Sequence, residues 1–165
     1  MGSEMCIRDS MTTELHPLGF FLPENTRLLM LGSFPPPRAR WSMDFYYPNI
    51  QNDMWRILGL IFYGNKDAFL RDKKAFSEEK AKAFCREKGI GIGDTAMEVI
   101  RLKANASDKF LEVVRPIDPE KVLSQIPECV AIVVTGQKAM DTLLSVLPGT
   151  EEPKVGFSSE FSCMG

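Results

Sequence analysis

The sequence is poor in the side chains that metal-dependent and triad-based catalysis requires. It has one histidine, His16, in its N-terminal arm, and a single imidazole argues against a Ser-His-Asp triad and against a metal centre. The cysteines include no C-x-x-C pair, so their spacing does not match that of zinc or iron–sulfur ligands. They are Cys6, Cys85, Cys129 and Cys163. We expect reduced thiols and no metal site.

Long apolar runs and an excess of one charge are also lacking. No run approaches the roughly 20 apolar residues that a membrane-spanning helix needs, and Met1–Ser10 lacks the apolar region of a signal peptide. We therefore expect a cytoplasmic protein without a membrane partner, and we expect it to be a monomer. The formal net charge of −2 at pH 7 gives no general attraction to nucleic acid, so such a partner requires a local basic patch.

The composition fits one globular domain. A chain of 165 residues with 44 % hydrophobic content can bury one core but is short for two. Residues 1–10 show no periodicity and precede Met11, so we interpret them as a leader and residues 11–165 as the domain. Pro153–Phe157 starts like a further strand, but no closing helix follows it. We interpret the domain as incomplete at its C-terminus.

Three short apolar runs predict the strands of a parallel sheet. They are Thr26–Gly32, Gly89–Asp94 and Val130–Val134. Each run is followed by polar residues or glycine, as expected where a buried strand ends in a loop.

Segments with helical patterns alternate with these strands. Asn52–Phe62 is apolar nearly all round and predicts a buried helix that starts near Asn49–Asn52. Thr95–Arg101 predicts either a short helix capped by Asp94 or a structured loop. Cap residues delimit the other helices. We expect these between Ser77 and Gly89, over Lys121–Ile126 after Asp118 and Pro119, and over Gln137–Leu147.

This alternation predicts an α/β protein with a short central parallel sheet covered by helices on both faces. In such sheets, ligands bind on the loops at the carboxyl ends of the strands. The corners Gly32–Pro35 and Thr135–Gln137 are therefore candidate sites. Gly89–Gly93 is rich in glycine but does not match the spacing G-x-G-x-x-G, so we give a nucleotide cofactor little weight.

The first corner and the residues after it carry a family resemblance. Leu31–Pro35, Phe45–Pro48 and Asn52–Trp55 resemble the first motif of the uracil-DNA glycosylase superfamily. Within it they are most similar to the branch of the mismatch-specific uracil-DNA glycosylases and the hypoxanthine-DNA glycosylases. Gly89–Asp94 and Val133–Ala139 fall where that branch has its second and third strands.

The resemblance implies a three-layer α/β/α fold and a monofunctional DNA glycosylase. Such an enzyme hydrolyses the N-glycosidic bond of a deaminated base, hypoxanthine or uracil, that has been flipped out of DNA. The reaction passes through an oxocarbenium-like sugar, so it needs a polar group to hold water, donors for the departing base and a pocket. It needs no cofactor, and its partner is DNA.

The resemblance also assigns the catalytic residue. Many members of the superfamily have Asp or Asn two residues after the glycine of the first corner, where this chain has Phe34. Phe34 has no polar atom to offer, and the hypoxanthine branch points instead to the Asn that opens the following helix. That residue is Asn52, and Asn49 is its nearest rival. The ordinary alternative for Asn52 is a helix N-cap.

Other residues are candidates for binding the base. They are Gly32, Ser33, Phe34, Tyr46, Tyr47, Asp94 and Asp108. The backbone N–H groups after the first strand would donate to a base oxygen, the aromatic rings would stack on the base, and the two carboxylates would contact its edge. The ordinary alternatives are a loop for the corner, core packing for the tyrosines and a helix cap for Asp94.

Arginines near the first corner are candidates for phosphate contacts. They are Arg38, Arg40 and Arg56, and their ordinary alternative is solvated surface charge. The last motif of the superfamily, a Pro- and Ser-rich loop that supports base flipping, has no counterpart in this chain, so we expect an incomplete site with impaired activity. Two other functions remain open, which are a non-catalytic nucleic-acid-binding protein on the same scaffold and a small-molecule hydrolase that uses Asp94.

Overall fold

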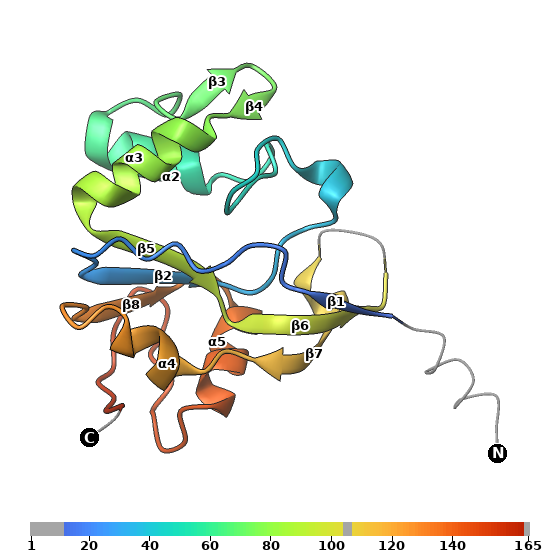
Figure 1. The fold of residues 1–165 in the computed structure, drawn as a ribbon, viewed down its shortest axis with the longest axis vertical. Coiled ribbons are helices and arrows are strands. Elements are labelled where there is room, and N and C mark those ends of the chain that lie inside the picture. The colour runs from blue at the N-terminus through green and yellow to red at the C-terminus, as the bar shows by residue number, and fades with distance from the viewer. Residues whose placement is uncertain (1–11, 104–106, 164–165) are drawn as a thin grey trace.

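A three-stranded parallel sheet forms the middle layer of the protein (Figure 1). The computed structural model describes residues 12–103 and 107–163, so the expected leader and Cys6 lie outside the described residues. The strands are β2 (Leu28–Gly32), β5 (Ile90–Asp94) and β8 (Ala131–Val134), in the order β5-β2-β8. The three predicted strands and the α/β fold with a short central parallel sheet are confirmed.

The register of the sheet brings the strand ends together. Leu28 is paired with both Ile90 and Ala131, and Gly32 at the end of β2 is paired with Asp94 at the end of β5. The loops that follow the strands therefore leave the sheet at the same edge, which is where ligands bind in open α/β sheets.

Helices cover both faces of this sheet. The helices α2 (Met54–Tyr63) and α3 (Glu78–Lys88) lie on one side, and α4 (Pro119–Ser124) and α5 (Gln137–Ser145) lie on the other (Figure 1). The predicted caps of α3 and α4 are confirmed. The Ser77 side chain accepts a hydrogen bond from the Lys80 N–H (3.2 Å), the Asp118 side chain caps α4, and Gly89 has a φ of +68°.

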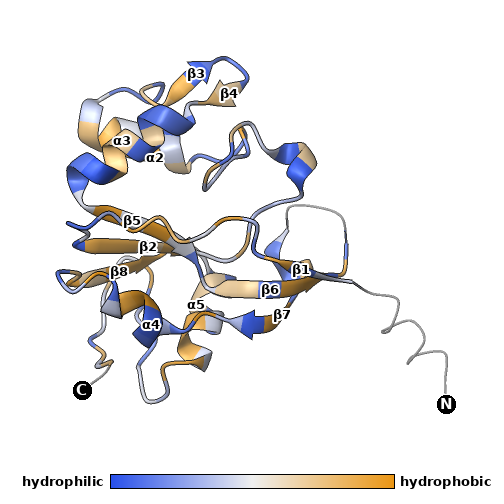
Figure 2. Ribbon diagram, viewed as in Figure 1, coloured by the Kyte–Doolittle hydropathy of each residue, from blue (hydrophilic) through white to orange (hydrophobic). Residues whose placement is uncertain are grey.

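Alternate residues of β2 supply the two halves of the core. Met30 packs with Trp55 and Phe84 in the layer of α2 and α3, whereas Leu29 and Leu31 pack with apolar residues of α4 and α5. This alternation follows from the two-residue period of a strand. Figure 2 shows the result as apolar strands between helices of mixed polarity.

A second, antiparallel sheet extends from the end of β5. Its strands are β1 (Thr13–Leu15), β6 (Ala96–Arg101) and β7 (Leu111–Pro116), in the order β1-β6-β7. The expectation of a helix or loop at Thr95–Arg101 is therefore wrong. One partner of β6 is β1, which is remote in sequence, and the other is β7, which follows after a loop. A local sequence pattern therefore does not reveal the pairing that makes this segment a strand.

Two expectations about apolar segments are also wrong. The helix α2 begins at Met54, and only one of its faces is buried, while Ile57, Leu60 and Ile61 are exposed. Pro153–Phe157 forms no strand, because the chain turns there and the Phe157 N–H bonds to the Lys154 carbonyl oxygen.

Short elements complete the described chain. The hairpin of β3 (Leu70–Asp72) and β4 (Ala75–Phe76) extends from the layer of α2 and α3, and two 3₁₀ turns, η1 (Arg38–Arg40) and η2 (Asp108–Phe110), interrupt loops. Within the described part of the chain, no helix has the length and apolar character to cross a membrane.

We expect truncation of a side chain to affect stability differently on the two faces of α2. Trp55 is fully buried, and its Nε1 donates to the Tyr46 carbonyl oxygen (2.9 Å). We expect Trp55→Ala to lower the free energy of unfolding by about 3–5 kcal/mol in urea denaturation followed by circular dichroism. The control is Ile61→Ala on the exposed face, where the residue is 67 % exposed and we expect a loss below about 1 kcal/mol. Equal losses would contradict the described packing of α2.

Candidate active site

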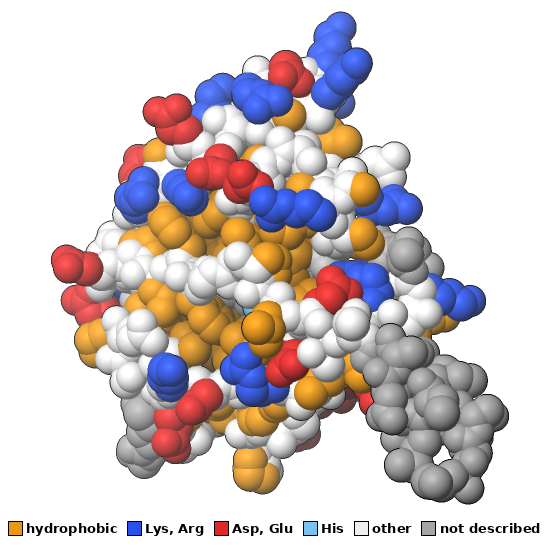
Figure 3. Space-filling model, turned by 45° about the vertical axis from the view of Figure 1, so that its right-hand side comes forward, with side chains coloured by type: hydrophobic (Ala, Val, Ile, Leu, Met, Phe, Trp, Pro, Cys, Tyr) orange, Lys and Arg blue, Asp and Glu red, His pale blue; other side chains and the backbone are white. Residues whose placement is uncertain are grey.

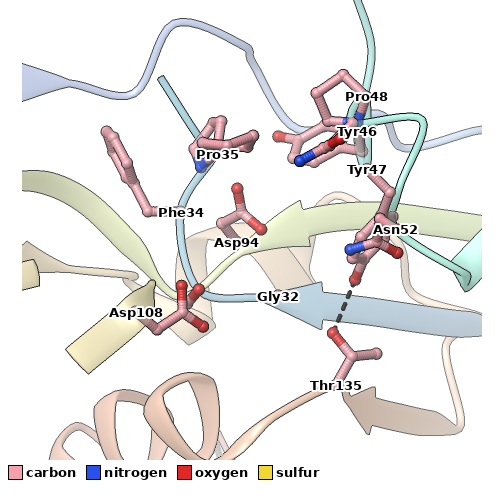
Figure 4. Close-up of a pocket in the computed structure, with 13 residues that line it drawn as sticks. Gly32, Phe34, Pro35, Tyr46, Tyr47, Pro48, Asn52, Asp94, Asp108 and Thr135 are labelled. Carbon is pink, nitrogen blue, oxygen red and sulfur yellow. Dashed lines mark hydrogen bonds between the residues drawn. The ribbon is translucent and has the colours of Figure 1, made fainter. Parts of the chain in front are cut away.

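A cavity of about 180 Å³ lies at the carboxyl end of the parallel sheet (Figure 4). The structure brings the catalytic candidate and all of the base-binding candidates to its wall. They are Gly32, Ser33, Phe34, Tyr46, Tyr47, Asn52, Asp94 and Asp108. Sequence analysis gave no individual role to four further lining residues, which are Pro35 and Thr135 at the two candidate corners, Pro36 and Pro48. It considered Asn49 only as a rival of Asn52.

Gly32 allows the walls of the cavity to approach one another. A Cβ atom at this position would lie 2.7 Å from Oδ1 of Asp94 and 3.2 Å from the hydroxyl oxygen of Tyr47. A side chain at position 32 would displace one or both of these groups. The glycine at the end of β2 is therefore required by the close packing of the site.

Two tyrosines form one side of the cavity. Tyr46 is buried, and its hydroxyl donates to the Gly19 carbonyl oxygen (3.1 Å). Tyr47 has a φ of +52°, a conformation that is uncommon for a bulky residue and is found in strained functional segments. Its hydroxyl lies 2.9 Å from Oγ1 of Thr135, which in turn donates to the Leu31 carbonyl oxygen (3.3 Å). Tyr47 is thus the donor to Thr135 (Figure 4).

Burial keeps both phenols uncharged. Removal from water is the main cause that raises the pKa of Tyr46 and of Tyr47 above the ordinary value, and the nearby Asp94 carboxylate raises it further. Each phenol therefore serves the site as a neutral ring with its hydroxyl hydrogen in place.

Asp94 does not cap a helix, so that alternative is wrong. It ends β5, and its Oδ2 lies 2.6 Å from Nε2 of His16, with each side chain only 6 % exposed. Burial raises the pKa of Asp94, while the hydrogen bond and charge of His16 oppose that rise. Sequence reasoning missed this role of His16, because the two residues are 78 positions apart and no local pattern connects them.

Each of the two asparagines at the cavity accepts a hydrogen bond from a backbone N–H group. Oδ1 of Asn52 accepts from the Met54 N–H (2.8 Å) at the start of α2, and Oδ1 of Asn49 accepts from the Gln51 N–H (3.0 Å). The N-cap of α2 is Asp53, which makes no side-chain cap hydrogen bond, so the ordinary alternative of Asn52 as the helix N-cap is wrong. Asn52 instead holds the turn that leads into the helix, and its side-chain nitrogen makes no hydrogen bond among the described residues.

The first corner contributes backbone donors and an apolar wall. Phe34 is 7 % exposed, its ring contacts the His16 ring edge-on at 5.3 Å between centroids, and it packs with Val99 and Leu111 of the second sheet. Among the described residues, the N–H groups of Ser33 and Phe34 have no hydrogen-bond partner. Such N–H groups at a strand end favour the binding of an oxygen atom with negative charge.

None of the arginine candidates lines the cavity. Arg38 is paired with Asp44 (2.9 Å) and lies over the Trp41 ring, while Arg56 lies near Asp53 (3.5 Å). Arg40 is exposed on η1. Figure 3 shows basic side chains over the upper half of one face, mixed with acidic ones. Phosphate contacts by the three arginines stay a prediction.

The acidic side chains at the cavity do not form a metal centre. Asp94 and Asp108 both line the cavity, and Asp108 is one cause of the raised pKa of Asp94. In the described part of the chain, no three His, Cys, Asp or Glu side chains are close enough together to hold a metal ion.

The buried phenols predict a loss of stability at high pH. Because the pKa of Tyr46 is raised in the folded protein, only the unfolded chain releases this proton above about pH 10, and stability then falls as pH rises. We expect the Tyr46→Phe and Tyr47→Phe variants each to lose less stability between about pH 10 and 11 than the wild type, by up to about 1.4 kcal/mol per pH unit. Urea unfolding at several pH values measures this difference. An unchanged slope in both variants would show that the phenols ionise in the folded protein.

Comparisons with known proteins agree with the geometry at the level of the fold. No protein-family model matches the sequence, and a search of curated proteins gave no significant match. The structure is similar to the solution NMR structure of a proposed uracil DNA glycosylase from Methanosarcina acetivorans, with a TM-score of 0.61 and 25 % sequence identity over 81 % of this chain and 78 % of that chain. The protein thus has a uracil-DNA-glycosylase-like α/β fold, and this likeness supports its placement in the uracil-DNA glycosylase superfamily.

Proposed function

We propose that the protein is a monofunctional DNA glycosylase that hydrolyses the N-glycosidic bond of hypoxanthine or uracil in DNA. One observation carries the proposal. A single cavity at the carboxyl end of the sheet gathers a carboxamide, two neutral phenols and two backbone N–H groups that have no partner in the described part of the chain. A glycosylase needs such groups to hold water, stack on a flipped base and stabilise the departing base. The fold likeness to a proposed uracil DNA glycosylase supports the same reaction class.

In the proposed reaction, the bond between C1′ of the sugar and the base nitrogen breaks, and its electron pair leaves with the base. The Ser33 and Phe34 N–H groups donate to a base oxygen, on which much of the negative charge resides. The Asn52 carboxamide orients a water molecule that attacks C1′ and releases a proton. The products are an abasic sugar and the free base, which takes up a proton.

DNA binding is proposed to extend beyond the cavity. Pro35 and Pro36 connect the first corner to η1, which carries Arg38 and Arg40. Because Arg38 follows the cavity residue Pro36 by two positions, these two arginines are the proposed contacts for the phosphates that flank the flipped nucleotide. The ion pair of Arg38 with Asp44 is largely exposed, so exchanging it for a phosphate costs little.

A non-catalytic nucleic-acid-binding protein on the same scaffold is the second candidate. Phe34 occupies the position at which much of the superfamily has a carboxylate or carboxamide, and Oδ1 of Asn52 is already bonded to the Met54 N–H. Both observations favour recognition of a base without its removal. The two candidates differ in whether the base is released.

A base-excision assay on single-stranded oligonucleotides and mismatched duplexes tests the proposal. We expect the wild type to release uracil or hypoxanthine, and Asn52→Ala to lower the single-turnover rate by about 100-fold or more while DNA affinity stays within about threefold. Asn65→Ala is the matched control. Its Oδ1 also accepts from a backbone N–H two residues later, at Asp67 (2.9 Å), but Asn65 lies at the other end of α2 and outside the cavity.

Three results would change the assignment. DNA binding without base release by the wild type would favour the binding protein. Full activity of Asn52→Ala together with loss in Asn49→Ala would transfer the water-holding role to Asn49. Equal losses in Asn52→Ala and Asn65→Ala would show that the effect comes from the stability of α2.

A further inference from the structure

A surface groove of about 370 Å³ has no part in the reaction proposed above. Arg38 of η1 lines it, together with Trp41 and Asp44, which follow η1. Arg71 of β3 and Glu78 of α3 also belong to its wall. In Figure 1, η1 and the hairpin of β3 and β4 lie on the same side of the parallel sheet. The volume of the groove is within the range of ligand sites.

Two hydrogen bonds connect this groove with the cavity. Nε1 of Trp41 donates to the Pro36 carbonyl oxygen (2.8 Å), and Oγ of Ser42 donates to the Pro48 carbonyl oxygen (2.6 Å). Trp41 and Ser42 line the groove, whereas Pro36 and Pro48 line the cavity. The groove is therefore adjacent to the cavity, and the same loop segments contribute to both.

Arg38 and Trp41 form a stack in the groove. The guanidinium carbon of Arg38 lies over the Trp41 ring, 4.1 Å from its centroid, and Nη2 of Arg38 is 2.9 Å from Oδ1 of Asp44. The ring covers one side of the guanidinium group, and the carboxylate holds its edge. The Arg38 side chain is still 66 % exposed, so its outer face is accessible to a ligand.

Charge does not favour a phosphate as the main ligand of this groove. Two guanidinium groups and two carboxylates line it, and their formal charges cancel. Arg71 is also paired with Asp72 (3.2 Å), and Glu78 is paired with Lys82 (3.0 Å). A guanidinium plane supported by an indole ring is instead a surface on which a nucleobase stacks.

Stacking on this surface requires a base with a free face. In a duplex, the neighbouring base pairs cover both faces of each base, whereas an unpaired base in a single strand exposes them. A base of any sequence satisfies this requirement, because every base has a π-face.

We propose that the Arg38–Trp41 stack is a second base-binding site, which receives the unpaired base next to the flipped nucleotide and thereby favours single-stranded DNA. The inference rests on the proposed function, because it specifies the form of DNA that the same enzyme binds. The face and the edge of a guanidinium group are different surfaces, so stacking does not exclude the phosphate contact of Arg38 proposed above.

The test measures binding to single-stranded oligonucleotides with one central 2′-fluoroarabino-uridine, whose glycosidic bond resists hydrolysis. In two further strands, an abasic tetrahydrofuran replaces the nucleotide on its 5′ side or on its 3′ side, which removes a base and retains the phosphates. Fluorescence anisotropy gives the dissociation constants. We expect the wild type to bind one of the abasic strands at least about fivefold more weakly than the intact strand. Equal affinity for all three strands would overturn the proposal.

Substitutions locate the stacking surface through this ratio of dissociation constants, since loss of the Arg38 charge alone lowers the affinity for every strand. We expect Arg38→Ala/Trp41→Ala to reduce the ratio to about one, and a full ratio in this variant would overturn the proposal. Trp41→Phe keeps a ring but loses the hydrogen bond to Pro36, so we expect it to retain most of the ratio. The matched control is Arg86→Ala, because Arg86 also lies over a ring, that of Phe21 (5.2 Å), but outside the groove and the cavity.

The same uracil strand annealed to its complement tests the preference for single strands. We expect the wild type to bind the duplex at least about fivefold more weakly than the single strand. Equal or tighter binding of the duplex would overturn the proposal.

A crosslinking experiment on the wild type decides the matter if the variants do not fold, as judged by thermal denaturation. The probe has 5-iodocytosine next to the fluoroarabino-uridine, and mass spectrometry identifies the residue to which irradiation joins it. We expect crosslinks to Trp41. Phe110 is the alternative, because Lys103 and Lys109 lie over its ring and it follows the cavity residue Asp108 by two positions. Crosslinks to Phe110 or elsewhere, without Trp41, would overturn the proposal.

The failure of this inference and that of the proposed function are distinguishable. Base release by the wild type together with equal affinity for the three single strands leaves the glycosylase proposal standing and removes only the second base-binding site. A stacking ratio that depends on Arg38 and Trp41, without base release, does the reverse.

Discussion

The site depends on the pairing of β2 with a parallel strand on each side. Because β2 is hydrogen-bonded to β5 and to β8 in matching register, Gly32, Asp94 and Thr135 meet at one edge of the sheet. The helices bury alternate faces of β2 and hold it in the centre of the molecule. A polar cluster can form at this edge because the apolar layers on both sides hold the strand ends in place.

The close packing of the site depends on a glycine at the end of β2. The absence of a side chain at Gly32 lets the Asp94 carboxyl group and the Tyr47 hydroxyl come close to the backbone. The second sheet has a related effect on the opposite wall, since it holds Phe34 against Val99 and Leu111. The cavity is thus formed by the carboxyl end of the parallel sheet together with the loops that carry Phe34 and Tyr47.

Periodicity and capping were sufficient to predict the elements that local sequence determines. The three parallel strands, the cap of α3 at Ser77 and the opening of α4 at Asp118 each follow from residues within a few positions of one another. The segment Thr95–Arg101 was misjudged because its partners in β1 and β7 are not visible in a local window. The apolar face of α2 was misjudged because composition does not say which side a neighbour covers.

The residues of the candidate site were also predictable only in part. Motif resemblance and strand ends brought Asn52, Tyr46, Tyr47 and Asp94 into one group, and the structure places all four at the cavity. The contact of His16 with Asp94 was not predictable, since a lone histidine in an arm has no pattern to interpret. The arginines were assigned from nearness in sequence, which does not determine whether a side chain reaches the cavity.

The separation of these contacts along the chain has a consequence for folding. His16 meets Asp94 across 78 residues, and Tyr47 meets Thr135 across 88. Contacts of high sequence separation close long loops and form late, after the entropy of those loops has been lost. A partly folded or nascent chain therefore lacks the complete cavity, which forms only when His16, Tyr47, Asp94 and Thr135 have come together. Binding of a ligand in the cavity therefore requires that nearly the whole domain is folded.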